Sequence, residues 1–208
     1  MAGPAFAQPT VRAHSLNAVG CMKLRECTQD VKQIKTFNDL VDHYGLYEIK
    51  HEEELRTLLN NLNKSGVEVY VADHTYFPVN TRGLYYTDVN RMFLNDVYIY
   101  DPDILLTVLR HEGWHAAQDC MAGTLDNTYI AVIHNPDKVP QEHKLMADIR
   151  YGLMQPKAIP WEQEAIWAAE QPNMTAEALS ACSAGRMWDT YEPTPLTRKW
   201  LEKNGYLR

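Results

Sequence analysis

The sequence predicts one α+β domain with a small mixed or antiparallel sheet and a helical C-terminal part. Three observations support this fold class. Short segments with alternating apolar residues gather between residues 67 and 94. A long helical segment follows them, and the rest of the chain shows only helical patterns and loops. With 208 residues, of which 45% are hydrophobic and 23% charged, the chain is large enough to bury a core.

The N-terminal quarter is expected to contain an arm and two amphipathic segments. Residues 1–25 are expected to form an extended arm, and residues 26–208 a single domain. The arm shows no basic start and no apolar core, so a secretory signal is not expected. Residues 27–42 form an amphipathic segment that packs on the core. Residues 52–63 form a helix whose acidic first turn is favoured by the helix dipole.

Three strands are expected next. Residues 67–72 alternate between apolar and polar side chains, as in a half-buried strand. Residues 83–87 and 91–94 flank Asp88-Val-Asn90, which predicts a hairpin directly before the long helix.

The long helix carries the chemistry that the sequence shows most clearly. Asp101 is expected as its N-cap, Pro102 as its first residue and Gly123 as its stop signal. Within it lies His111-Glu112-Gly-Trp-His115, in which the two histidines are one helical turn apart and share a face. Their nitrogens can therefore bind one zinc ion, while Glu112 is placed to act as a general base on water. The alternative is a buried helix whose histidines only form hydrogen bonds.

A catalytic zinc site needs a third protein ligand, because it keeps its fourth position for water. Six residues after His115 there is no His or Asp, which disfavours the metzincin pattern. A second expected helix, residues 160–170, offers Glu162, Glu164 and Glu170 as candidates. Its alanines would allow close approach to Gly113 and the alanines that follow it.

The motif His111-Glu112-x-x-His115, followed about fifty residues later by Glu164-Ala165 on an alanine-rich helix, resembles the gluzincin metallopeptidases. By position, the resemblance implies Glu164 as the third zinc ligand, with Glu162 and then Glu170 as alternatives. It also implies a zincin-like domain that hydrolyses peptide bonds. The last strand before the motif helix, residues 91–94, would be the cleft edge that pairs with an extended peptide. Segments 110–120 and 191–197 resemble metallopeptidase-like proteins of marine cyanobacteria and their phages.

A zinc peptidase also needs a donor that stabilises the developing oxyanion. Tyr151 and His134, both between the two candidate metal-binding helices, are the catalytic candidates for this role.

Charge and composition narrow the function further. The net charge of −7 and a pI near 5.6 disfavour nucleic acid as a partner. No apolar run is long enough to cross a membrane, so we expect a soluble, cytoplasmic protein, with association with a virus particle as an alternative. The four cysteines are expected to be buried free thiols, although Cys120 with Cys182, or Cys21 with Cys27, would pair in an exported protein.

The sequence therefore predicts zinc-dependent hydrolysis of a peptide or protein substrate. The alternative function is that of a non-catalytic zinc-binding structural or interaction protein. A closed structural zinc site would need a fourth protein ligand, for which Asp119 or another histidine is a candidate.

Overall fold

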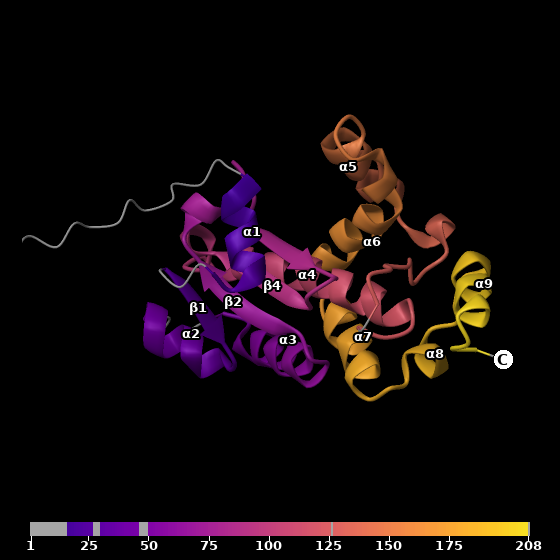
Figure 1. The fold of residues 1–208 in the computed structure, drawn as a ribbon, viewed down its shortest axis with the longest axis horizontal. Helices are drawn as coiled ribbons and strands as arrows, with labels where there is room; N and C mark the ends of the chain where they lie inside the picture. The colour runs from indigo at the N-terminus through magenta and orange to yellow at the C-terminus, as the bar shows by residue number, and fades with distance from the viewer. Residues whose placement is uncertain (1–15, 27–29, 46–49, 126, 208) are drawn as a thin grey trace, which may run out of the picture.

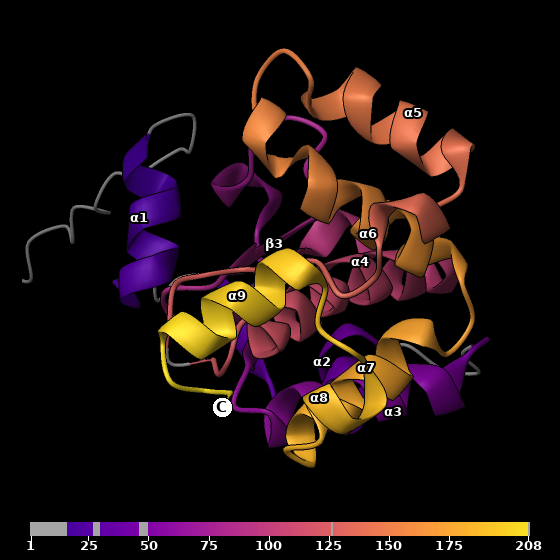
Figure 2. The same cartoon turned by 90° about the vertical axis from the view of Figure 1, so that its right-hand side faces the viewer.

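The computed structural model describes residues 16–26, 30–45, 50–125 and 127–207. It confirms the α+β class (Figure 1). A four-stranded mixed sheet and its covering helices come from the N-terminal half, and the C-terminal half is helical. Figure 2 shows helix α4 (Pro102–Met121), which carries the two histidines, in the middle of the molecule, with the later helices of the chain above it, in front of it and below it. Among the described helices, none is both long enough and apolar enough to cross a membrane.

The sheet consists of β1 (Val31–Ile34), β2 (Glu68–Ala72), β3 (Gly83–Tyr86) and β4 (Arg91–Asn95), in the order β1-β2-β4-β3. β2 and β4 are parallel, and the two outer pairs are antiparallel. The expected hairpin is confirmed as β3 and β4. The expectation that residues 91–94 form the open edge is wrong, because β4 lies between β2 and β3 and its backbone pairs on both sides. The two edge strands are β1 and β3, and β3 is the one that lies against α4.

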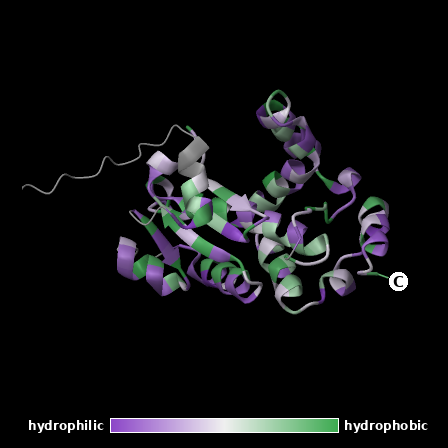
Figure 3. Cartoon of the chain, in the orientation of Figure 1, coloured by the Kyte–Doolittle hydropathy of each residue, from purple (hydrophilic) through white to green (hydrophobic). Residues whose placement is uncertain are grey.

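The alternation along the strands produces two buried faces. Val69 and Leu94 belong to the main core, which includes the leucines of α3 (Glu52–Lys64). Phe93 points to the other face and packs with Met22 of α1 (Leu16–Leu24). Figure 3 shows hydrophobic residues, green, along the strands, and the two core clusters place their side chains on both faces of the sheet.

The structure corrects two expectations about the N-terminal part of the chain. The expected arm, residues 1–25, includes helix α1, which covers one face of the sheet; residues 1–15 lie outside the described residues. The amphipathic segment 27–42 is divided into β1 and α2 (Phe37–Tyr44). A capping box between Thr36 and Asp39 starts α2 and separates it from the strand.

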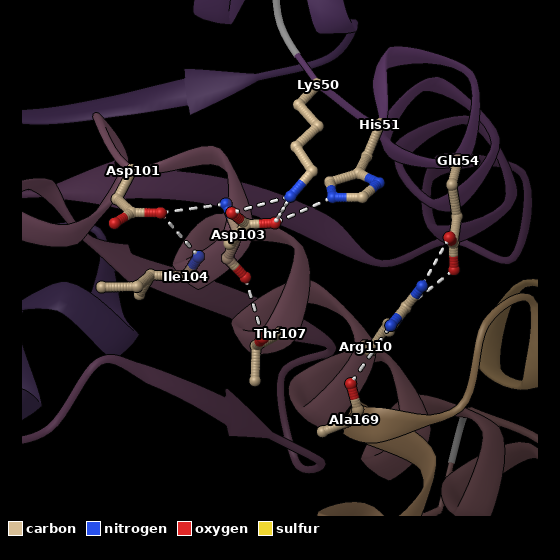
Figure 4. A network of polar contacts seen from close by, with 9 residues as sticks. All are labelled: Lys50, His51, Glu54, Asp101, Asp103, Ile104, Thr107, Arg110 and Ala169. Atoms are coloured by element: carbon tan, nitrogen blue, oxygen red, sulfur yellow. Dashed lines mark hydrogen bonds and ion pairs between the residues drawn. The ribbon is translucent and has the colours of Figure 1, made fainter.

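Helix α4 (Pro102–Met121) begins where the sequence predicts. The Asp101 carboxylate accepts hydrogen bonds from the backbone N–H groups of Asp103 and Ile104, at 3.0 and 3.1 Å. One residue before His111, Arg110 donates two hydrogen bonds to Glu54 of α3, at 2.8 and 2.6 Å (Figure 4). Both side chains of this ion pair are largely buried, so it fixes α4 against α3 near the motif.

The C-terminal helices are α5 (Gln141–Tyr151), α6 (Ile159–Glu170), α7 (Met174–Ser183), α8 (Met187–Thr190) and α9 (Pro195–Lys203). Both α6 and α7 pack on α4. The fully buried Ala165 and Ala168 permit the close approach of α6. Gly113, however, faces α7: a Cβ atom there would lie 3.0 Å from Thr175 Cγ2 and 3.3 Å from Leu179 Cδ1.

The three cysteines among the described residues are oxidised. Cys120 at the end of α4 and Cys182 in α7 form a disulfide with a Cα–Cα distance of 5.9 Å, and Cys21 is also disulfide-bonded. No described cysteine is a free thiol, so the expectation of free thiols is wrong.

Candidate metal centre

The packing of α6 on α4 brings His111, His115 and Glu162 together. Their nearest ligand atoms all lie within 4.8 Å of one another. His111 Nε2 is 3.3 Å from Glu162 Oε2, and His115 Nε2 is 3.5 Å from Glu162 Oε1. The two imidazole rings are nearly perpendicular, with centroids 5.0 Å apart. Two nitrogens and one carboxylate thus converge on one point, which is the ligand set of many catalytic zinc sites.

The cluster is strongly coupled electrostatically. Burial raises the pKa of Glu162, but its contacts with His111 and His115 outweigh burial and hold that pKa well below the usual range. Burial lowers the pKa of His115, and the Glu162 carboxylate outweighs it, raising the pKa to about 9. In the absence of a metal, a protonated imidazole therefore balances the buried carboxylate.

The Glu112 side chain lies beside this cluster, between the α4 backbone and the edge strand β3. Its side chain is buried, and burial raises its pKa against the opposing effects of His111 and His115. Gly83 of β3 makes room for it, since a Cβ atom at that position would be 2.9 Å from Glu112 Cγ and 2.6 Å from Val108 Cγ1. Any larger residue at position 83 would displace the Glu112 side chain.

Tyr85 provides a second contact between the edge strand β3 and α4. Its hydroxyl donates a hydrogen bond of 2.8 Å to Asp119 Oδ2. Burial and the Asp119 charge raise the pKa of Tyr85. Asp119 is fully buried, its Oδ1 has no hydrogen-bond partner, and burial raises its pKa to about 7. Asp119 does not belong to the metal cluster, so it does not supply a fourth ligand there.

Gln118 orients the second histidine. Its Oε1 accepts a hydrogen bond from His115 Nδ1 at 2.9 Å, which leaves Nε2 as the atom directed toward Glu162. Its Nε2 donates to Glu164 Oε2 at 2.7 Å and to the Trp161 carbonyl at 3.1 Å. The sequence analysis missed this residue, although its position three residues after His115 on the same helix face was a usable signal.

The third residue of the cluster differs from the one that the sequence analysis favoured. Glu162, the alternative, lies in the cluster, whereas the favoured Glu164 does not. The Glu164 carboxylate accepts hydrogen bonds from Gln118, from the Trp114 indole and from the backbone N–H groups of Ile133 and His134. It is 1% exposed and holds the segment after α4 against α6. The other alternative, Glu170, contacts His143 at 3.1 Å.

The two candidate oxyanion donors lie in different places, and only one of them is next to the cluster. Tyr151, the last residue of α5, lies with its hydroxyl beside Glu162, and burial together with that carboxylate raises its pKa. It is therefore protonated and next to the cluster. His134 is not brought to the cluster: its imidazole packs among the rings of Trp114, Trp167 and Tyr191, with centroids 5.5–5.7 Å away. Its expected catalytic role is not supported.

No family model, curated protein or solved structure matches the chain. Inference about its function therefore depends on the geometry of the residues themselves.

Proposed function

We propose that this protein is a zinc-dependent hydrolase of peptide bonds, with His111, His115 and Glu162 as the metal-binding residues and Glu112 as the general base. The observation that carries the proposal is the convergence of two imidazoles and one carboxylate from α4 and α6, with a second buried carboxylate beside them. A purely structural site has no need of that second carboxylate.

The donor set fits a zinc ion. Two neutral imidazole nitrogens and one carboxylate oxygen are typical ligands of catalytic zinc. Glu162 Oε2 is buried and forms no hydrogen bond, and His111 Nε2 lies 3.3 Å from it. Both atoms can act as zinc ligands, so a cation held between them would satisfy the carboxylate oxygen. When bound, zinc would act as a Lewis acid toward the scissile carbonyl and would make water more acidic.

The chain's own residues account for the proton movements. Glu112, whose pKa is raised by burial, would take a proton from the attacking water and return it to the leaving amine. The Tyr151 hydroxyl would donate a hydrogen bond to the oxyanion that develops on the carbonyl oxygen. Gln118 would hold His115 in the tautomer that exposes Nε2 to the metal.

The unpaired side of the edge strand β3 supports the proposal that the substrate is a peptide. Among the described strands, β3 pairs only with β4, and Glu112 lies against it at Gly83. An extended peptide that added to the free side of β3 would pass close to Glu112. β3 therefore replaces residues 91–94 as the proposed substrate-binding strand.

Metal binding is tested by zinc content and zinc affinity of purified wild type, Glu162→Gln and Glu170→Gln. Both substitutions are on α6 and make the same chemical change, but Glu170 lies outside the cluster. We expect one zinc per chain in wild type and Glu170→Gln, and a loss of stoichiometric zinc in Glu162→Gln. Wild type without bound zinc would refute the proposed site.

Catalysis is tested with Glu112→Gln, using denatured casein as the probe and mass spectrometry to detect new peptide ends. Zinc content should stay at one per chain, while cleavage should fall by about 100- to 10,000-fold, the usual contribution of a general base. Zinc binding without any cleavage by wild type would favour the alternative, a non-catalytic zinc-binding structural or interaction protein.

The disulfides bear on the compartment. The sequence favours the cytoplasm, but disulfides persist mainly in oxidising compartments, and Cys120, Cys182 and Cys21 are all oxidised. We therefore favour an oxidising compartment as the place where the enzyme acts.

A further inference from the structure

A second candidate binding site lies among the C-terminal segments. It is a pocket of about 600 Å³ between the segment that follows α4 and the connection from α8 to α9. None of its lining residues belongs to the metal cluster. A space of this size is within the usual range for small-molecule sites. The residues that the inference uses are Ile133, His134, Lys138, Tyr191, Glu192 and Arg198.

The inner part of the pocket is apolar and aromatic. Ile133 is buried, and Tyr191 is half-buried with its ring 5.7 Å from that of His134. The core residue Trp114 and the partly buried Trp167 pack against His134. Burial, with the Lys138 charge as a second cause, lowers the pKa of His134, so its imidazole is neutral at neutral pH. A hydrophobic group of a ligand would find matching contacts here.

The rim of the pocket carries two cations from separate segments. Lys138 comes from the segment after α4, and Arg198 comes from α9. Both are exposed, and in the described part of the chain neither has a carboxylate within 4.0 Å. Glu192 is the one acidic lining residue, so the lining carries a positive balance in a chain whose net charge is −7. Such a local reversal of charge favours an anionic ligand.

We propose that this pocket binds a small molecule that combines an apolar body with an anionic head group. The body would pack on Ile133, Tyr191 and the face of His134. The head group, a carboxylate or a phosphate, would lie between Lys138 and Arg198, whose side chains donate charge-assisted hydrogen bonds to either anion. The inference does not depend on the metal centre.

The experiment is isothermal titration calorimetry on the full chain with three probes. N-acetyl-L-phenylalanine supplies the carboxylate, phenyl phosphate supplies the phosphate, and N-acetyl-L-phenylalaninamide keeps the apolar body but has no charge. We expect at least one anion to bind about tenfold or more tightly than the amide, and its identity would show which head group the pocket prefers. Lys138→Ala and Arg198→Ala should each weaken that binding by about tenfold.

Lys199→Ala is the matched control, because Lys199 is an exposed cation on the same helix as Arg198 but does not line the pocket. It should leave the affinity within about twofold of wild type. The proposal is overturned if no anion binds at 10 mM, a concentration on the order of the weakest specific affinities. Equal binding of the amide and the anions would overturn it too, as would an equal loss in Lys199→Ala and Arg198→Ala.

Discussion

Replacement of the buried Asp119 by Asn should make the protein more stable at alkaline pH and should leave it little changed in acid. Asp119 is fully buried one turn after His115, and its one hydrogen bond comes from the Tyr85 hydroxyl. Its second oxygen has no partner. An Asn side chain keeps an oxygen for Tyr85 and carries no charge, so the substitution removes the ionisation and little else.

The magnitude follows from the pKa of Asp119. Burial raises it to about 7 from an ordinary value of 3.8. Between these two values the unfolded chain has lost the proton that the folded chain still holds. The contribution of this group is therefore fully present below pH 3.8 and is lost as the pH rises toward 7. A shift of about three pKa units corresponds to about 4 kcal/mol, which is the upper limit of the effect.

The assay is urea unfolding followed by circular dichroism at pH 5, 6, 7 and 8, with a chelator present so that metal binding does not contribute. We expect the stability of Asp119→Asn relative to wild type to increase across this range by about 2–3 kcal/mol, because part of the full effect lies below pH 5. Other ionisable groups are shared by both proteins and cancel in the difference. Asp148→Asn, which changes an exposed carboxyl on α5, is the control and should show no such trend. A difference that stays constant within about 1 kcal/mol from pH 5 to pH 8 would refute a buried, protonated Asp119.

Three further predictions concern the metal centre and its support. Gly83→Ala should lower the free energy of unfolding by about 1–3 kcal/mol and reduce casein cleavage, because the new methyl group would overlap Val108 and displace Glu112; an unchanged urea midpoint would contradict this. Gln118→Leu should weaken zinc binding about 10- to 100-fold in a competition titration with a chromophoric chelator, because His115 loses its orienting acceptor. Replacing Cys120 and Cys182 together by Ser should cost about 4 kcal/mol of stability in urea unfolding, given a sequence separation of 62, and equal stability of the two proteins would show that the bridge is not formed.

The parts of the site that the sequence predicts correctly are local. The spacing of His111 and His115 fixes their relation through helix geometry alone, and Asp101 with Pro102 marks the start of that helix. Both features depend on residues within a few turns of one another. They are therefore recognisable without knowledge of the rest of the fold.

The identity of the third residue in the candidate metal cluster depends on tertiary packing. Glu162 and Glu164 are two residues apart, so they point about 200° apart around α6. Which of them reaches the histidines depends on the rotation of α6 about its axis, and this rotation is set by the burial of its alanines against α4 and by the hydrogen bonds of Glu164. The resemblance to gluzincins selected the carboxylate that the fold uses to hold its own backbone.

The order of the strands could not be predicted from the sequence pattern either. Both β3 and β4 are short and contain consecutive apolar or aromatic residues, and such a pattern indicates a buried strand but not whether its edge is paired. The parallel pairing of β2 with β4 placed the later strand inside and the earlier one at the edge. Similarly, the cysteine spacing alone did not show that Cys120 and Cys182 meet when α7 packs on α4.

The disulfide has a consequence for the unfolded chain as well. Along the sequence, 47 positions separate His115 from Glu162. Through the bridge the path is about half as long, because Cys120 follows His115 by five positions and Cys182 follows Glu162 by twenty. Closing the shorter path costs less chain entropy and raises the effective concentration of Glu162 near the histidines roughly two- to threefold. An oxidised chain should therefore capture zinc during refolding more readily than a reduced one.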